Sequence, residues 1–182
     1  MHHSESDYFT DRVREFHAKH GAPIGVGVTL EALTLRKSLV LEEASEILLA
    51  VHDKNEAEFV DGLADFIYVA AGTWVSVGTK KTPIRTNLNP IKGVHELWDF
   101  KFVGSVHHRI DKAIESLMKY RLSELIYHAV ALPHELGYDV KGIFDEIHAS
   151  NMTKTPTKGD IRVRVKGPDY RAPDVTRFLR GE

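Results

Sequence analysis

The chain has 182 residues, of which 42% are hydrophobic and 27% charged, and its formal net charge is -2. This length and balance are typical of one globular domain and exclude a fibrous or wholly disordered protein. The near-neutral charge argues against a general nucleic-acid or membrane-surface binder. Because the sequence has no cysteine, a disulfide framework and a thiolate metal site are also excluded.

The sequence shows no sign of export or membrane insertion. The N-terminal stretch MHHSESDYFT lacks the apolar core of a signal peptide. The weakly charged run at 66–79 is too short and too rich in Gly, Thr and Ser to span a bilayer. We therefore expect a cytoplasmic protein, in the host cytoplasm if it is phage-encoded, with no membrane partner.

Apolar residues recur at three- and four-residue steps along most of the chain, which predicts helices. The predicted helices cover 7–20, 30–54, 56–77, 106–135 and 140–149. The glycine-rich stretch 21–29 is predicted to be a loop.

Two further segments lack this periodicity. Residues 79–104 contain Pro83, Pro90 and Gly93 and exceed the usual length of a bundle connection. Such a segment is usually a lid, an oligomer arm or disordered, and we expect an arm. The tail at 153–182 is basic and proline-punctuated, and its residues 161–165 are compatible with a short strand.

These elements predict an all-α fold, a four- to five-helix bundle with a long insert between central helices and an irregular basic C-terminal tail. One domain is expected over 1–182, with the insert at 79–104 and the tail at 153–182.

Two neighbouring predicted helices carry stripes of acidic residues. The segment LEEASE at 41–46 places its glutamates within roughly a 100° arc of the first helix. The acids at 58, 61 and 65 fall within roughly 60° of the second, and an antiparallel pair would make the stripes face each other. Clustered carboxylates are unfavourable without cations, and oxygen ligands favour Mg²⁺ or Mn²⁺ over Zn²⁺. The six residues are Glu42, Glu43, Glu46, Glu58, Asp61 and Asp65.

Asp65 is the strongest candidate among these acids. Glutamate runs on helices are usually solvated faces, so LEEASE alone does not establish a site. From Gly62 to Gly78, however, Asp65 is the only charged residue and stands among apolar neighbours. A carboxylate there needs a partner, which is either a metal ion or a basic side chain.

At these residues the chain resembles the MazG-like all-α nucleoside triphosphate pyrophosphohydrolases, in particular their phage and bacterial branch. Their signature is an EExxE segment followed by ExxD on the next helix. EEASE at 42–46 fits the first half, and Asp65 followed by Phe-Ile-Tyr resembles the family aspartate. Gly62 stands where the family usually has an acid, so Asp61, or Glu58 with Asp61, would supply the missing ligand.

The likeness extends to other parts of the chain. REFH at 14–17 resembles the opening helix of MazG-like relatives. IFDEIHASNMTK at 143–154 resembles their closing helix with its Asn-x-x-Lys element. Lys-Gly-Pro at 166–168, followed by Tyr170 and Pro-Asp at 173–174, resembles the tail of phage and bacterial members.

The resemblance implies hydrolysis of a (deoxy)nucleoside triphosphate to its monophosphate and pyrophosphate, with two or three Mg²⁺ ions that Mn²⁺ can replace. The implied metal ligands are Glu42, Glu43, Glu46, Asp61 and Asp65, and the implied catalytic residues are Glu43, Glu46 and Asp65. The implied nucleotide-binding residues are Asn151 and Lys154, with Lys166, Tyr170 and Arg171 as weaker candidates. Some phage-encoded relatives act on dGTP, so we expect dGTP or GTP first, with phosphoribosyl-ATP, dUTP and dCTP as alternatives. The resemblance also implies a homodimer or homotetramer. No nucleic-acid partner is expected, because the net charge is near neutral.

Other interpretations remain open at this point. Asn151 and Lys154 are also compatible with a helix cap and a solvated side chain. The dipeptide His52-Asp53 suggests an HD-type phosphohydrolase, which needs further metal-binding residues on other helices. A non-catalytic helical binding or scaffold protein would show no metal dependence. Trp74, Asn87 and Trp98 are candidates for contacts with a base, although each is more often a core or loop residue.

Overall fold

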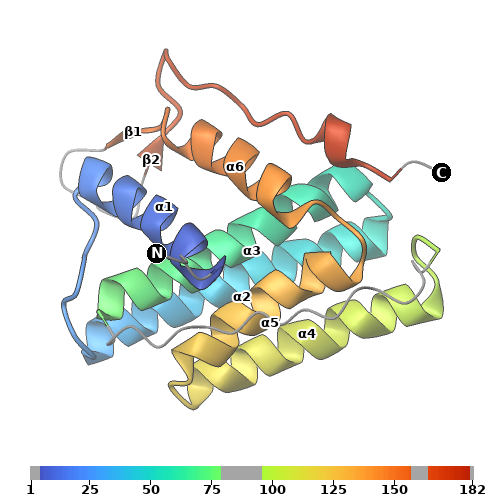
Figure 1. Ribbon diagram of the computed structural model, residues 1–182, viewed down its shortest axis with the longest axis horizontal. Coiled ribbons are helices and arrows are strands. Elements are labelled where there is room, and N and C mark those ends of the chain that lie inside the picture. The colour runs from blue at the N-terminus through green and yellow to red at the C-terminus, as the bar shows by residue number, and fades with distance from the viewer. Residues whose placement is uncertain (1–4, 79–95, 157–163, 181–182) are drawn as a thin grey trace.

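The computed structural model describes residues 5–78, 96–156 and 164–180 of the chain. Within these ranges the protein is a bundle of six α-helices, shown in Figure 1. The helices are α1 (Glu5–His20), α2 (Leu30–Asp53), α3 (Glu56–Val77), α4 (Phe100–Met118), α5 (Leu122–Glu135) and α6 (Val140–Asn151). The predicted all-α bundle is confirmed.

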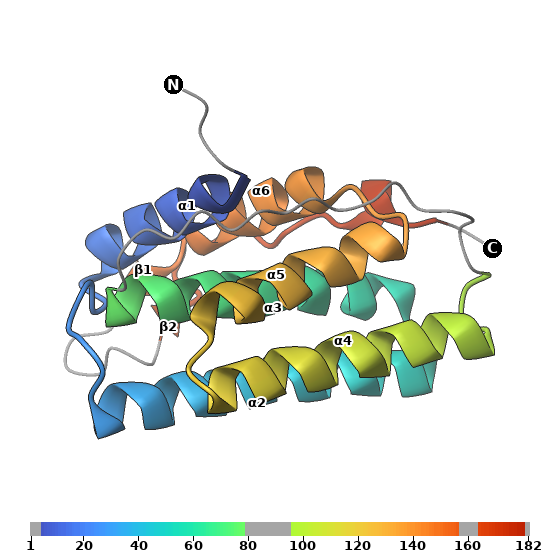
Figure 2. The same ribbon diagram turned by 60° about the horizontal axis from the view of Figure 1, so that its bottom comes forward.

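Helices α2 and α3 form a tight antiparallel pair, as Figure 2 shows. Lys54 adopts a left-handed conformation with φ 54°, which ends α2 and reverses the chain. The side chain of Asn55 then accepts a hydrogen bond from the Glu58 amide and caps α3. The two acidic stripes therefore lie on helices that pack directly against each other.

Helix α3 forms the centre of the core. It packs against α1, α2, α5 and α6, and most of its side chains are buried. By length and composition it is the one helix of the described segments that meets the requirements for crossing a membrane, but 83% of its apolar window is buried inside the bundle. Its apolar character is explained by this central position.

The single helix predicted over 106–135 is wrong. Helix α4 ends at Met118, and α5 begins at Leu122 and runs back along it. Tyr120 between them adopts a left-handed conformation with φ 56°. The apolar periodicity continues across this turn because both helices bury a stripe in the same core, so the pattern does not mark the break.

The predicted insert at 79–104 is only partly described. Residues 79–95 lie outside the described part of the chain, whereas α4 already begins at Phe100. The Asp99 side chain caps α4 by accepting a hydrogen bond from the Phe102 amide at 2.6 Å. The insert is therefore shorter than the sequence indicates.

The C-terminal tail lies along α6 (Figure 1). It contains two paired antiparallel strands, β1 (Thr155–Pro156) and β2 (Arg164–Val165), and a 3₁₀ turn, η1 (Thr176–Phe178). Glu146 of α6 holds the tail, because its carboxylate accepts from the Asp174 amide at 3.1 Å and pairs with two tail arginines. β2 confirms the end of the strand suggested at 161–165, whose earlier residues lie outside the description.

Candidate active site

The close approach of α2 and α3 determines which acids face each other. Gly62 of α3 lies against Ile47 of α2, and a Cβ atom at Gly62 would stand 3.1 Å from Ile47 Cγ1. A side chain at this position would therefore require Ile47 to shift by a few tenths of an ångström. Gly62 thus permits the close contact between α2 and α3. The acids of α3 stand on either side of Gly62 in the sequence, at Asp61 and Asp65.

Glu43 of α2 and Asp65 of α3 lie partly buried within electrostatic reach of each other. Burial, followed by the negative charge of Asp65, raises the pKa of Glu43 to about 8. Burial, followed by the charge of Asp61, raises the pKa of Asp65 to about 7. Without a cation, both side chains therefore resist ionisation.

Asp61 completes the acidic group on α3. Burial and the nearby Glu58 raise the pKa of Asp61, while Lys154 acts in the opposite direction. Its Oδ1 atom is buried and has no hydrogen-bond partner among the described residues. A buried carboxylate oxygen without a donor is costly, so this atom is suited to a bound cation.

The remaining predicted acids lie at the rim of this group. Glu42 and Glu46 of α2 are exposed, and both contribute negative charge at Glu43. Glu58 is exposed beside Asp61. The structure thus brings all five predicted metal ligands into one acidic neighbourhood, which we call the carboxylate cluster: Glu42, Glu43, Glu46, Asp61 and Asp65.

The end of α6 adds polar and basic groups to the carboxylate cluster. Asn151 is buried, and its side chain hydrogen-bonds to Asp65, which lowers the pKa of that carboxyl. The charge of Lys154 lowers the pKa of both Asp65 and Asp61. The predicted Asn-x-x-Lys element therefore faces the acids of α3.

The tail contributes a second lysine. Lys166 is among the charges that lower the pKa of Asp61, and its Nζ atom lies 5.1 Å from the centre of the Tyr170 ring. Arg171, in contrast, pairs with Glu146 at 3.2 Å. Arg171 thus fastens the tail to α6, while Lys166 and Tyr170 lie on the side of the carboxylate cluster.

The donor set of the carboxylate cluster fits a hard divalent cation. Its ligands are oxygens only, and a cation would remove the repulsion that raises their pKa values. Across the described ranges, no three His, Asp or Glu side chains already stand at the spacing of a metal-binding group. The carboxylates are therefore neighbours and not a preformed coordination sphere.

Sequence comparison links these helices to a known family. The phosphoribosyl-ATP pyrophosphohydrolase family matches residues 13–90, which include α2, α3 and every acid of the carboxylate cluster. The matched family is part of the MazG-like all-α nucleoside triphosphate pyrophosphohydrolase superfamily, the group that the sequence resembles. The match agrees with the predicted resemblance, and the matched family consists of pyrophosphohydrolases, which are hydrolases acting on acid anhydrides.

A viral protein shares part of this sequence. An uncharacterised protein of Acanthamoeba polyphaga mimivirus is 23% identical over 150 aligned residues, which cover 68% of this chain. The chain spans 59% of the length of that relative. No solved structure matches the sequence.

Other candidates from the sequence lie away from the carboxylate cluster. His52 and Asp53 bond to each other at 2.7 Å on the exposed end of α2, and no HD-type metal group forms in the described part of the chain. Trp74 is buried in the core. Trp98 packs against the rings of Phe59 and Phe102, and Asn87 lies outside the described residues.

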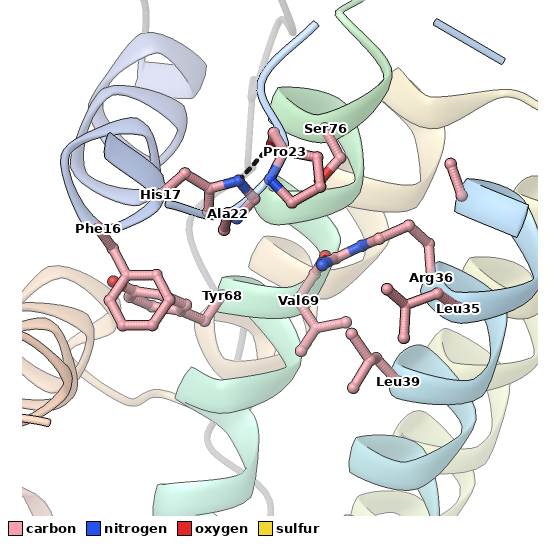
Figure 3. Close-up of a pocket in the computed structure, with 11 residues that line it drawn as sticks. Phe16, His17, Ala22, Pro23, Leu35, Arg36, Leu39, Tyr68, Val69 and Ser76 are labelled. Carbon is pink, nitrogen blue, oxygen red and sulfur yellow. Dashed lines mark hydrogen bonds between the residues drawn. The ribbon is translucent and has the colours of Figure 1, made fainter. Parts of the chain in front are cut away.

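The structure also contains a pocket that the sequence did not reveal (Figure 3). A partly open cavity of about 170 Å³ lies between α1, α2 and α3. We call it the Arg36 pocket, and its walls include Phe16, His17, Leu39, Tyr68, Val69 and Ser76. One sequence signal could have indicated this pocket, namely a basic residue on an apolar stripe. Arg36 precedes Val40 and Ala44 by one and two turns on the buried stripe of α2.

Proposed function

We propose that this protein hydrolyses a (deoxy)nucleoside triphosphate to its monophosphate and pyrophosphate, and that the reaction requires Mg²⁺. The observation that carries the proposal is the partly buried, mutually repelling pair Glu43 and Asp65 with Lys154 nearby. Carboxylates that repel each other in this way favour binding of a divalent cation. An adjacent lysine can bind the phosphate groups that such cations accompany.

The carboxylate cluster would hold two or three Mg²⁺ ions through Glu42, Glu43, Glu46, Asp61 and Asp65. The unpartnered Oδ1 atom of Asp61 and the raised pKa values of Glu43 and Asp65 support this assignment. Bound Mg²⁺ supplies positive charge to phosphate oxygens and makes water more acidic. Mn²⁺ has similar oxygen preferences and would replace Mg²⁺.

Several side chains of the protein itself would act on the substrate. Lys154 and Lys166 would contact phosphate oxygens, because both lie near Asp61. Asn151 would hold the Asp65 carboxylate in place through its hydrogen bond. Glu43 would accept the proton of the attacking water as general base. Tyr170 lies against Lys166 and would restrict where its ammonium group points.

Guanine nucleotides are our leading substrates. Phosphoribosyl-ATP is the alternative named by the matching family, and dUTP and dCTP are alternatives within the same fold. We further propose a homodimer or homotetramer in the cytoplasm, with the insert predicted at 79–104 as the arm for assembly.

Substitution of the acids tests the proposed function. In Glu46→Gln and Asp65→Asn, pyrophosphate release from nucleoside triphosphates in Mg²⁺ should be lost, while the helical circular dichroism spectrum stays unchanged. Asp111→Asn is the matched control, because Asp111 is exposed on α4. Full activity in Glu46→Gln or Asp65→Asn would refute the assignment. Unchanged nucleotide with the wild-type protein would favour a non-catalytic binding protein.

A further inference from the structure

Arg36 is a buried cation without an acidic partner. Arg36 is only 8% exposed, and within the described segments no Asp or Glu side chain pairs with it. Burial lowers the pKa of Arg36 to about 10, so the guanidinium stays charged at neutral pH. A buried charge of this kind is costly unless it serves a ligand or a hydrogen-bond network.

The bonds that Arg36 does form orient its guanidinium across the pocket. Nε donates to Thr73 Oγ1 at 3.1 Å, and Nη2 donates to the Val69 carbonyl at 2.7 Å. Figure 3 shows the side chain extending from α2 toward Val69 of α3. A guanidinium has five N–H groups, and these bonds occupy two of them. Arg36 lines the cavity, and its other three N–H groups take no part in these two bonds.

Gly72 makes room for this arrangement. A Cβ atom at Gly72 would stand 2.6 Å from Arg36 Nη2 and 3.3 Å from His17 Nε2. Any side chain at position 72 would therefore push the guanidinium out of place. The α1–α2 connection is held beside it, because His17 Nδ1 donates to the Pro23 carbonyl at 2.8 Å.

The pocket has the size and the walls to hold an aromatic ring. A cavity of about 150 Å³ accommodates benzene, and the Arg36 pocket measures about 170 Å³. Phe16 and Tyr68 stand edge to face on one side, with ring centres 5.4 Å apart. Tyr68 is fixed there by a 3.0 Å hydrogen bond between its hydroxyl and His148 Nδ1. Rigid aromatic walls of this kind suit stacking with a planar ligand.

The pocket adjoins the carboxylate cluster along both helices. Val69 follows Asp65 by one turn of α3, roughly 6 Å along the helix axis. Arg36 precedes Glu43 by two turns of α2, roughly 10 Å. A nucleotide with its phosphates at the carboxylate cluster would thus bring its base to Arg36.

We propose that Arg36 reads the base of the nucleotide and selects 6-oxopurines, guanine above all, over adenine. This inference rests on the proposed function, because the phosphates of the same nucleotide are placed at the carboxylate cluster. A guanidinium carries donors only. Guanine offers two adjacent acceptors, N7 and O6, whereas adenine places an amino donor beside N7. The donor-only Arg36 therefore matches guanine and opposes adenine.

Binding of substrate analogues that resist cleavage tests this inference separately from hydrolysis. We would titrate the full chain in Mg²⁺ with the α,β-imido analogues of dGTP and dATP by calorimetry. Wild type should bind the guanine analogue about ten- to a hundredfold more tightly, the size of one bidentate base contact. Arg36→Gln should lose most of this preference. Arg36→Lys should also lose it, because lysine keeps the charge without the planar fork.

Two controls separate specificity from folding. Lys37→Gln alters the exposed neighbour of Arg36 on α2 and should keep the full preference. If Arg36→Gln does not fold, a 7-deaza form of the guanine analogue tests wild type directly, because it lacks the N7 acceptor and should bind about tenfold more weakly. Equal binding of both bases to wild type, undiminished binding of the 7-deaza form, or a preference that survives in Arg36→Lys would overturn the inference. If wild type prefers the guanine analogue but hydrolyses no nucleoside triphosphate, the proposed function is refuted instead.

Discussion

The carboxylate cluster should destabilise the protein whenever metal ions are removed. Burial and neighbouring acids raise the pKa of Asp65 from 3.8 to about 7 and that of Glu43 from 4.5 to about 8. Below neutral pH the folded protein therefore holds protons that the unfolded chain has released. Because the folded state binds more protons, the free energy of unfolding falls as the pH rises from about 4 to about 8.

The size of this effect follows from the raised pKa values. Each tenfold change in an acid constant corresponds to about 1.4 kcal/mol. For Asp65, the rise from 3.8 to about 7 therefore sets an upper limit of about 4 kcal/mol at alkaline pH. Asp65 and Glu43 repel each other, so their separate effects do not add. Asp65→Asn removes the charge but weakens the bond from Asn151, and we expect a net stabilisation of about 2 kcal/mol.

Urea unfolding monitored by circular dichroism measures this prediction. In EDTA, wild type should be less stable at pH 8 than at pH 5, and Asp65→Asn should be the more stable protein at pH 8. Mg²⁺ should stabilise wild type far more than Asp65→Asn, and the exposed control Asp111→Asn should behave as wild type. The reasoning is refuted if Asp65→Asn is less stable than wild type at pH 8 in EDTA, or if wild-type stability does not change with pH.

Three further substitutions test other parts of the structure. Lys154→Ala should lower kcat/KM about tenfold or more through the lost phosphate contact, with unchanged thermal unfolding; an unchanged kcat/KM would remove Lys154 from the site. Glu146→Gln should weaken the tail attachment, destabilise the protein by about 1–2 kcal/mol and speed tail cleavage in limited proteolysis; equal cleavage rates would contradict this role. Gly72→Ala should displace the Arg36 guanidinium, cost about 1–3 kcal/mol of stability and reduce the guanine preference, and calorimetry showing wild-type preference would count against the proposed geometry.

Much of the fold could be predicted because local signals agree with tertiary packing. Helix α3 was predicted with its observed bounds, since Asn55 caps its start and Gly78 follows its end. The turn between α4 and α5 was missed for the opposite reason. Its left-handed residue is Tyr120, and no Gly, Pro or Asn marks the reversal.

The candidate site was predictable to the extent that it lies on single helices. Helical spacing placed Asp61 and Asp65 on one face, and the resemblance pointed to Asn151 and Lys154. Two features depend on contacts between helices, which spacing does not contain. Gly62 is favoured by its close contact with Ile47, and the Arg36 pocket is assembled by three helices together.

Product analysis tests the central claim most directly. Phosphorus NMR would follow dGTP, the other nucleoside triphosphates and phosphoribosyl-ATP during incubation with the wild-type protein, in Mg²⁺ and in EDTA. We predict that one or more of these compounds yields pyrophosphate and its own monophosphate form in equal amounts, in Mg²⁺ only. Release of a nucleoside diphosphate and orthophosphate, or no cleavage of any of them, would contradict the proposed function.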